Sequence, residues 1–188
     1  MPQNENWQIK CSPYPYQIND YVNIFGIEKS RMDVFNHRKN PNIGFDFDDT
    51  LITQVLNDKK ETVIKYNKNV IKVMIKHILQ KQKIYIITRR DKNENKLIRN
   101  ILKEKIGNVY LNNIIILHAN KYYQNKSFLI SLYNITIYYG DSDSDMYHAL
   151  RGGAKPIRVL RNVNSKDKSL IHIGLLKEDL FYCSQIIE

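Results

Sequence analysis

Three acidic side chains follow one short apolar segment of the chain. Asp46, Asp48 and Asp49 stand close together in NIGFDFDDTLI, after residues that predict a buried strand. Carboxylates crowded in this way repel one another and raise one another's pKa values unless a cation compensates them. A hard divalent cation resolves this, and a site with one or two carboxylates plus a substrate phosphate is typical of Mg²⁺. The segment therefore indicates a metal and phosphorus chemistry.

Polar side chains also follow two further predicted strands. Thr88 is the last residue of KIYIIT, and Arg89 and Arg90 follow it. The run GDSDSD begins at the last residue of ITIYYG and contains Asp141 and Asp145. In parallel sheets, ligands bind beyond the carboxyl ends of the strands. We therefore expect these side chains to gather with the first acids at one edge of a sheet.

Alternating apolar patterns predict the elements that position these residues. Strands are expected at 42–47, 83–88, 112–117, 135–140 and 155–161, and helices at 67–82, 92–106, 125–133 and 143–153. This alternation predicts an α/β protein with a mostly parallel five-stranded sheet, covered by helices on both faces. Residues 1–40 are polar and read as an N-terminal arm or lid, and 41–188 as one domain.

The motifs and their order resemble those of the haloacid dehalogenase (HAD) superfamily of phosphatases. That family's pattern is D-x-D-x-T, then Ser or Thr at a strand end, then Lys, then G-D-x-x-x-D. Here it reads Asp46 to Thr50, Thr88, Lys126, and Gly140 to Asp145. The resemblance implies a HAD-like Rossmannoid three-layer fold, with a minimal cap because only 37 residues separate Thr50 from Thr88.

The resemblance implies a role for each acid. Asp46 would be the nucleophile that forms an aspartyl-phosphate, and Asp48 the general acid and base. Mg²⁺ would be held by an Asp46 oxygen, the main-chain carbonyl of Asp48 and the Asp141 carboxylate. Asp145 completes the metal site, where it would orient a metal-bound water or Lys126.

The resemblance also implies a phosphate-binding set. Thr88 and Lys126 would hold the phosphoryl oxygens, where fixed donors stabilise the charge of the transition state. Arg90 either contacts substrate or forms a solvated basic turn with Arg89. Asp49 reads equally as a turn residue or a functional residue and is left out of the site, and Asp143 reads as a helix N-cap.

Within the superfamily, the segment from Lys126 to Ser165 is similar to bacterial class B acid phosphatases. Their Y-G-D-S-D-x-D and G-A-x-x-I-R-[IV]-L-R segments match it, and the similarity covers residues 42–52 and about 83–165. Class B enzymes are exported and carry a longer insert after the first motif, whereas we expect no signal peptide in this chain. Their T-G-R is replaced here by Thr88-Arg89-Arg90.

Composition leaves the partner open. The 188 residues carry a formal net charge of +10, but the lysines are spread along the chain, so the charge by itself does not establish nucleic-acid binding. We expect a cytoplasmic phosphomonoesterase that acts on small phosphorylated substrates such as nucleotides, with no membrane segment and with a homo-oligomer left open. The alternatives are a nucleic-acid end phosphatase with the same chemistry and a catalytically silent HAD-fold binding module. The five histidines show no ligand spacing and are assigned no chemistry.

Overall fold

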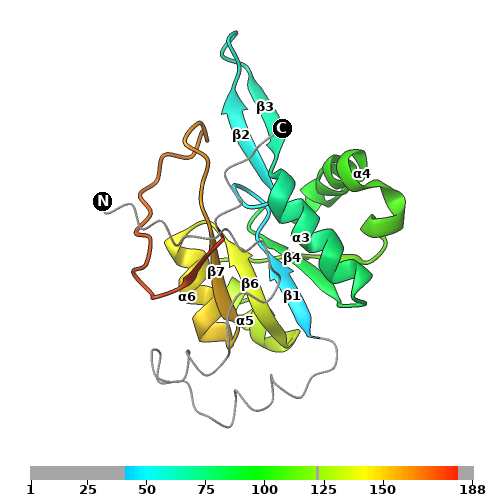
Figure 1. Ribbon diagram of the computed structural model, residues 1–188, viewed down its shortest axis with the longest axis vertical. Coiled ribbons are helices and arrows are strands. Elements are labelled where there is room, and N and C mark those ends of the chain that lie inside the picture. Colours follow the sequence, from blue (N-terminus) through cyan, green and yellow to red (C-terminus); the bar gives the residue numbers. More distant parts are fainter. Residues whose placement is uncertain (1–40, 122, 182–188) are drawn as a thin grey trace, which may run out of the picture.

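The computed structural model describes residues 41–121 and 123–181, which form an α/β fold (Figure 1). Its main sheet has six parallel strands in the order β5-β4-β1-β6-β7-β8. The strands are β1 (Asn42–Phe45), β4 (Ile84–Thr88), β5 (Ile114–His118), β6 (Ile135–Gly140), β7 (Lys155–Val159) and β8 (Asp179–Phe181). Five of them are the expected strands. The sixth, β8, corrects the expected number and was missed because it is only three residues long.

Connections on either side of β1 run in opposite directions across the sheet. From β1 the chain moves outward through β4 to β5, and then returns to the other side of β1 for β6, β7 and β8. Such a reversal is the point where α/β sheets form a crevice outside the carboxyl ends of the strands. The residues that follow β1, β4 and β6 therefore face a common crevice.

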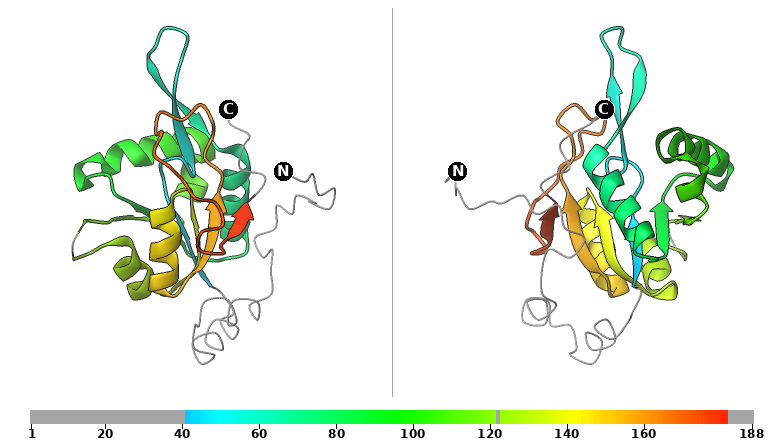
Figure 2. Two further views of the ribbon diagram at one scale, coloured as in Figure 1. Left: turned by 90° about the vertical axis from the view of Figure 1, so that its left-hand side faces the viewer. Right: turned by 45° about the vertical axis from the view of Figure 1, so that its right-hand side comes forward.

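Helices cover both faces of the sheet (Figures 1 and 2). The helices α3 (Lys68–Leu79) and α4 (Asn95–Leu111) bury their apolar stripes in one core cluster, with β1 and β4. The helices α5 (Lys126–Leu132) and α6 (Asp143–Gly152) pack on the opposite face in a second cluster. The expected three-layer arrangement is confirmed.

The expected helices are present, with shifted ends. A short 3₁₀ turn, η1 (Lys92–Glu94), precedes α4, and α4 runs on to Leu111 across a break at Gly107, whose φ of 73° suits glycine. The side chain of Asn125 caps α5 by accepting from the backbone N–H of Phe128. Lys126 is therefore held in the first turn of α5.

The start of α6 corrects one expectation. Its N-cap is Ser142, whose hydroxyl accepts from the N–H of Asp145, while Asp145 reaches back to the N–H of Ser142. Asp143 lies one position later and instead pairs with Arg158 and His172. The capping box fixes Asp145 at the turn that begins α6.

An antiparallel hairpin extends from the sheet between β1 and α3. It consists of β2 (Ile52–Leu56) and β3 (Thr62–Tyr66), and Figure 1 shows it standing above the carboxyl ends of the strands. The loop between β7 and β8 lies against it, because the backbone N–H of Lys166 donates to the carbonyl of Gln54 at 2.8 Å. The short distance between the first two motifs thus holds a small hairpin and no inserted domain.

The predicted N-terminal arm, residues 1–40, lies outside the described residues. Within the described residues, no helix is both long and apolar enough to cross a membrane.

Candidate active site

A pocket of about 440 Å³ lies at the carboxyl ends of β1, β4 and β6. Six of the residues that line it were selected from the sequence: Asp46, Asp48, Thr88, Lys126, Asp141 and Asp145. The loop after β7 contributes Arg161, Asp167, Ser169 and Leu170. Elements that are far apart in the sequence thus place the motif residues in one cavity.

Lys126 holds the centre of the site. Its Nζ lies 2.6 Å from Oδ1 of Asp46 and 2.6 Å from Oδ1 of Asp145. All three side chains are almost completely buried. Since a buried charge is costly unless it is paired, the two ion pairs fix the position of Asp46 at the end of β1.

The balance of charge in this cluster is negative. Burial raises the pKa of Asp46 well above its usual value, and Asp145 raises it further, although Lys126 opposes both. Burial alone would raise the pKa of Asp145, but the ion pair with Lys126 and hydrogen bonds from Ser142 hold it below its usual value. Burial would lower the pKa of Lys126, but Asp145 and Asp46 raise it well above its usual value. The cluster thus holds two buried carboxylates against one buried ammonium.

Asp141 lies beside this cluster and pairs with an arginine from another element. Nε and Nη2 of Arg161 lie 2.7 and 2.6 Å from Oδ2 of Asp141. Burial and the neighbouring Asp145 nevertheless raise the pKa of Asp141 to about 7. The main-chain carbonyl of Asp141 accepts from Arg158, which is buried in β7. Asp141 is thus fixed through both its side chain and its backbone.

Gly140 makes the approach of Asp145 possible. A Cβ at Gly140 would lie 2.4 Å from Cβ of Asp145 and 2.8 Å from its Cγ. Any side chain here would push Asp145 away from the end of β6. The glycine of the G-D-x-x-x-D motif is therefore required by close packing.

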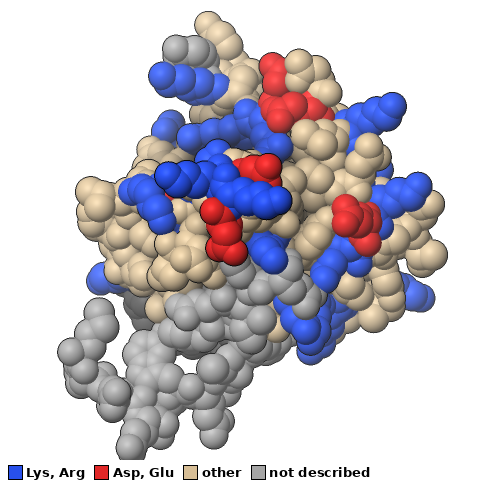
Figure 3. Space-filling model, turned by 90° about the horizontal axis from the view of Figure 1, so that it is seen from above, with Lys and Arg blue, Asp and Glu red and all other residues tan. Residues whose placement is uncertain are grey.

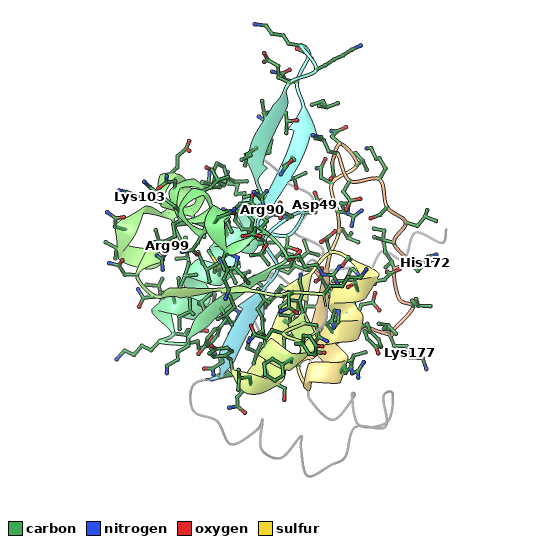
Figure 4. The ribbon with its side chains drawn as sticks, turned by 180° about the vertical axis from the view of Figure 1, so that it is seen from behind. Asp49, Arg90, Arg99, Lys103, His172 and Lys177 are labelled. Carbon is green, nitrogen blue, oxygen red and sulfur yellow. The ribbon has the colours of Figure 1, made fainter. Side chains whose placement is uncertain are left out.

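Asp48 pairs with Arg90. Nε and Nη2 of Arg90 donate to the two carboxylate oxygens of Asp48 at 2.8 and 2.7 Å. Arg90 also reaches Glu94 at 3.3 Å and lies over the ring of Phe47 at 5.2 Å. Figure 4 shows Arg90 together with Asp49 below the base of the hairpin. The structure therefore brings Arg90 against the acid at position 48.

Thr88 ends β4 inside the pocket. Its Oγ1 accepts from the N–H of Arg90 at 3.1 Å, which leaves the hydroxyl proton able to donate. Lys126 is the second donor in the pocket that was selected from the sequence. Thr88 and Lys126 thus both offer a proton donor to the same pocket.

The donor set fits a hard metal ion. Oxygens of Asp46, Asp141 and Asp145 lie within 4.8 Å of one another. Oδ1 of Asp49 is buried and has no partner among the described residues. Carboxylates with no sulfur or nitrogen ligand favour Mg²⁺ and similar cations over softer metals.

Arg161 and Asp49 are among the pocket residues that were not selected from the sequence. Arg161 is the last residue of the G-A-x-x-I-R-[IV]-L-R segment, but no role was assigned to it from the sequence. Its contact with Asp141 depends on the conformation of the loop after β7. Asp49 is a turn residue, with φ of 57°, but its carboxyl also lines the pocket and lies 3.9 Å from Arg161. Its buried, unpaired oxygen could not be foreseen from the pattern.

The fold and the site have the features of HAD-superfamily phosphatases: a parallel α/β sheet, an acid pair after the first strand, and the buried lysine between two acids. Among known proteins, the chain is similar to class B acid phosphatases. The chain is 35% identical over 113 residues to the class B acid phosphatase of Edwardsiella ictaluri, covering 58% of this chain and 46% of that protein. It is 32% identical over 111 residues to that of Salmonella arizonae, covering 58% and 47%.

A third relative is viral. Uncharacterized protein L684 of Acanthamoeba polyphaga mimivirus is 37% identical over 112 residues, covering 54% of this chain and 22% of that protein. No protein-family model matches the chain. The chain is homologous to class B acid phosphatases, which belong to the HAD superfamily. It spans about half the length of the curated class B relatives described above.

Proposed function

We propose that the protein is a Mg²⁺-dependent phosphomonoesterase that works through an aspartyl-phosphate intermediate, with nucleotides as substrates. The arrangement around Lys126 is the main support for this proposal. Lys126 holds Asp46 and Asp145 at 2.6 Å each, in a pocket that also contains Asp48, Asp141 and Thr88. The class B acid phosphatases among the relatives support the same reaction.

In the first half-reaction, a carboxylate oxygen of Asp46 attacks phosphorus and forms a P–O bond while the bond to the leaving oxygen breaks. Asp48 gives its proton to that leaving oxygen. Both oxygens of Asp48 accept from Arg90 in this structure, so the substrate must displace at least one of those hydrogen bonds. The hydroxyl of Thr88 and the ammonium of Lys126 hold the phosphoryl oxygens.

In the second half-reaction, Asp48 takes a proton from water. The water oxygen bonds to phosphorus, the bond to Asp46 breaks, and inorganic phosphate leaves. Asp46 returns as a carboxylate and Asp48 carries the proton again. The reaction therefore splits one difficult displacement into two easier ones.

Mg²⁺ fits beside these residues. Asp46, Asp141 and the main-chain carbonyl of Asp48 would hold it, with Asp145 bound directly or through water. When bound, it shields the anionic nucleophile from the anionic substrate. The raised pKa values of Asp46 and Asp141 support this assignment, since a divalent cation stabilises their charged forms.

Hydrolysis of an aryl phosphate by the Asp46→Asn variant tests the proposal. We expect kcat to fall by about a thousandfold or more, because the amide cannot act as the nucleophile. Asp48→Asn should be slowed by about 10² to 10⁴, and intact mass spectrometry after acid quenching should show a phosphorylated protein. Asp58→Asn, at the exposed turn of the hairpin, is the matched control and should retain activity.

Wild-type rates in Asp46→Asn would contradict the nucleophile assignment. Absence of hydrolysis by the wild-type chain on aryl phosphates, nucleotides and end-phosphorylated oligonucleotides with Mg²⁺ would favour the silent binding module instead. Circular dichroism of each variant distinguishes lost chemistry from lost folding.

A further inference from the structure

A second pocket of about 630 Å³ lies beside the active site. It opens beyond the carboxyl ends of β4 and β5, which pair from Ile84 opposite Ile114 to Thr88 opposite His118. Its lining is Arg89, Arg90, Asp91, Lys92, His118, Ala119, Asn120, Lys121, Gln124, Asn125 and His148. Arg89 lines both pockets, so a group bound here is next to a phosphate bound in the active site.

The lining is strongly basic. The lining has four cationic side chains, Arg89, Arg90, Lys92 and Lys121, and one carboxylate, Asp91. Arg90 is already paired with Asp48 and Glu94, so the other three cations determine the charge that the pocket offers to a ligand. The Asp91 carboxylate already caps η1 by accepting from the N–H of Asn93. Figure 3 shows Lys and Arg side chains surrounding small acidic patches on the face seen from above. The pocket therefore favours an anion.

Arg89 is held ready for such an anion. Its guanidinium donates to the hydroxyl of Ser144 at 2.6 Å and contacts Nε2 of His148 at 3.4 Å. Among the described residues no carboxylate pairs with it. Two neutral partners thus orient an exposed guanidinium at the border of the two pockets without neutralising its charge.

His148 also lines the second pocket. Arginine can only donate, so the contact makes Nε2 the acceptor and leaves the proton on Nδ1. Nδ1 is buried and has no partner among the described residues. Burial and the nearby Arg89 lower the pKa of His148, in agreement with a neutral ring. An unpaired buried donor costs free energy unless a ligand or water satisfies it.

We propose that this pocket is a second phosphate subsite, and that the substrate carries another phosphate close to the one that is hydrolysed. The inference rests on the proposed function and names its substrate class. Arg89 is the specificity-determining residue, because its forked guanidinium can bind the second phosphate. It directly follows Thr88, which lines the active site. Glycine at this position, as in the T-G-R of class B acid phosphatases, would lack the fork.

The lining argues against an uncharged leaving group as the occupant. Ala119 is the one aliphatic residue of this pocket's lining, and an uncharged aryl or aliphatic group would leave the guanidinium of Arg89 without an anionic partner. A phosphate would instead accept charge-assisted hydrogen bonds from arginine and lysine. The second phosphate can be the monoester of a small bisphosphate or the diester of a nucleic-acid end, and the experiment distinguishes these two sources.

The experiment compares kcat/KM for three probes at low salt. They are a nucleoside 5′-monophosphate, the corresponding 3′,5′-bisphosphate and an oligonucleotide with a phosphate at its 5′ end. We expect at least one probe with a second phosphate to exceed the monophosphate by about tenfold, the effect of one hydrogen bond between charged groups. Arg89→Gln should remove this gain, largely through KM.

Arg99→Gln on α4 is the matched control, because it loses the same charge away from both pockets (Figure 4), and it should keep the gain. A gain for the bisphosphate identifies a small-molecule source, and a gain for the oligonucleotide alone identifies a nucleic-acid end. Equal kcat/KM values for all probes, or an equal loss in the two variants, would overturn the subsite.

A binding measurement separates this inference from the proposed function. Asp46→Asn with Mg²⁺ should bind the bisphosphate or the oligonucleotide more tightly than the monophosphate by calorimetry, and the added change Arg89→Gln should abolish the difference. If the wild-type chain hydrolyses nothing but this difference is present, the proposed function fails and the subsite remains. If hydrolysis is present without any difference, only the subsite fails.

Discussion

At the scale of single residues, the site is a group of acids that one lysine cannot neutralise. Lys126 contacts Asp46 and Asp145, and Arg161 contacts Asp141. Burial still raises the pKa values of Asp46 and Asp141. Stability is therefore lower than it would be with neutral side chains, and a bound divalent cation would offset this cost.

The pH dependence of stability tests this charge balance at Asp141. Its pKa rises from the usual 3.8 to about 7, so the folded protein keeps a proton that the unfolded chain has released. Stability from this group is therefore lost as the pH rises from about 4 to 7. Without divalent ions, we expect Asp141→Asn to gain about 2 kcal/mol relative to wild type between pH 5.5 and 7.5. Thermal unfolding measures this gain as a relative rise in Tm of about 2 to 4 °C per kcal/mol.

The two proteins must be compared because other groups act in the opposite direction. Burial lowers the pKa of His77 to about 4 and also lowers the pKa of His148, so these two groups make the folded protein less stable as the pH falls. The difference between wild type and Asp141→Asn cancels their effect. Mg²⁺ should raise the Tm of wild type more at pH 7.5 than at pH 5.5. A difference in Tm that does not change with pH would contradict the raised pKa of Asp141.

At the scale of elements, one buried arginine ties together the segments that carry the site. Arg158 on β7 pairs with Glu178 before β8, with Asp143 on α6 and with the carbonyl of Asp141. Glu178 also accepts from the N–H groups of Gly174 and Leu176. The same side chain thus fixes the turn after β6 and the return of the loop to the sheet.

Replacing this arginine tests how far those elements depend on it. We expect Arg158→Met to destabilise the fold by about 3 to 5 kcal/mol, because it leaves Glu178 charged and unpaired in the interior. Urea unfolding measures the loss. Arg158→Met combined with Glu178→Gln should recover part of it, since the amide is neutral and still accepts from the backbone. A loss below about 1 kcal/mol in the single variant would mean that water compensates Glu178.

The sequence predicted the elements whose apolar pattern is long and regular. The strand at 135–140 has the predicted bounds, and the helix predicted at 125–133 is shorter by one residue at each end. The hairpin was missed because β3 is mostly exposed, so it shows no apolar alternation. The three residues of β8 join the sheet only through pairing with β7, which no local pattern reports.

The site was predictable where its residues follow strands in motif order. Asp46, Lys126 and Asp145 meet as expected, because β1 and β6 are adjacent and α5 begins at the same edge. Asp48 follows β1 and Arg90 follows β4, and two hydrogen bonds pair their side chains. This pairing depends on the rotamers of both side chains, which the sequence pattern does not specify. The sequence suggested that Arg90 contacts substrate or solvent, and neither alternative included this pairing.

At the scale of the whole molecule, the net charge of +10 can attract a polyanion in two ways. It can act as a diffuse field over the surface, or through the cationic side chains of one binding site. Lysines and arginines occur on most elements, including the exposed side of α4 with Lys103 (Figure 4). The second pocket is the one place described above where several of them line a cavity next to the active site. The two alternatives differ in how affinity for a polyanion depends on salt.

Salt titration of oligonucleotide binding distinguishes them. Each contacted phosphate of a single strand releases counterions, so log K falls with log salt with a slope of about −0.7 per contact. If Arg89, Lys92 and Lys121 bind phosphates, Asp46→Asn with fixed Mg²⁺ should show a slope of about −2 for a 5′-phosphorylated oligonucleotide. Arg89→Gln in the same background should reduce its magnitude by about 0.7, whereas Arg99→Gln should leave it unchanged. Equal reductions in the two variants would assign the affinity to the diffuse field, because a field depends on the total charge and not on which arginine supplies it.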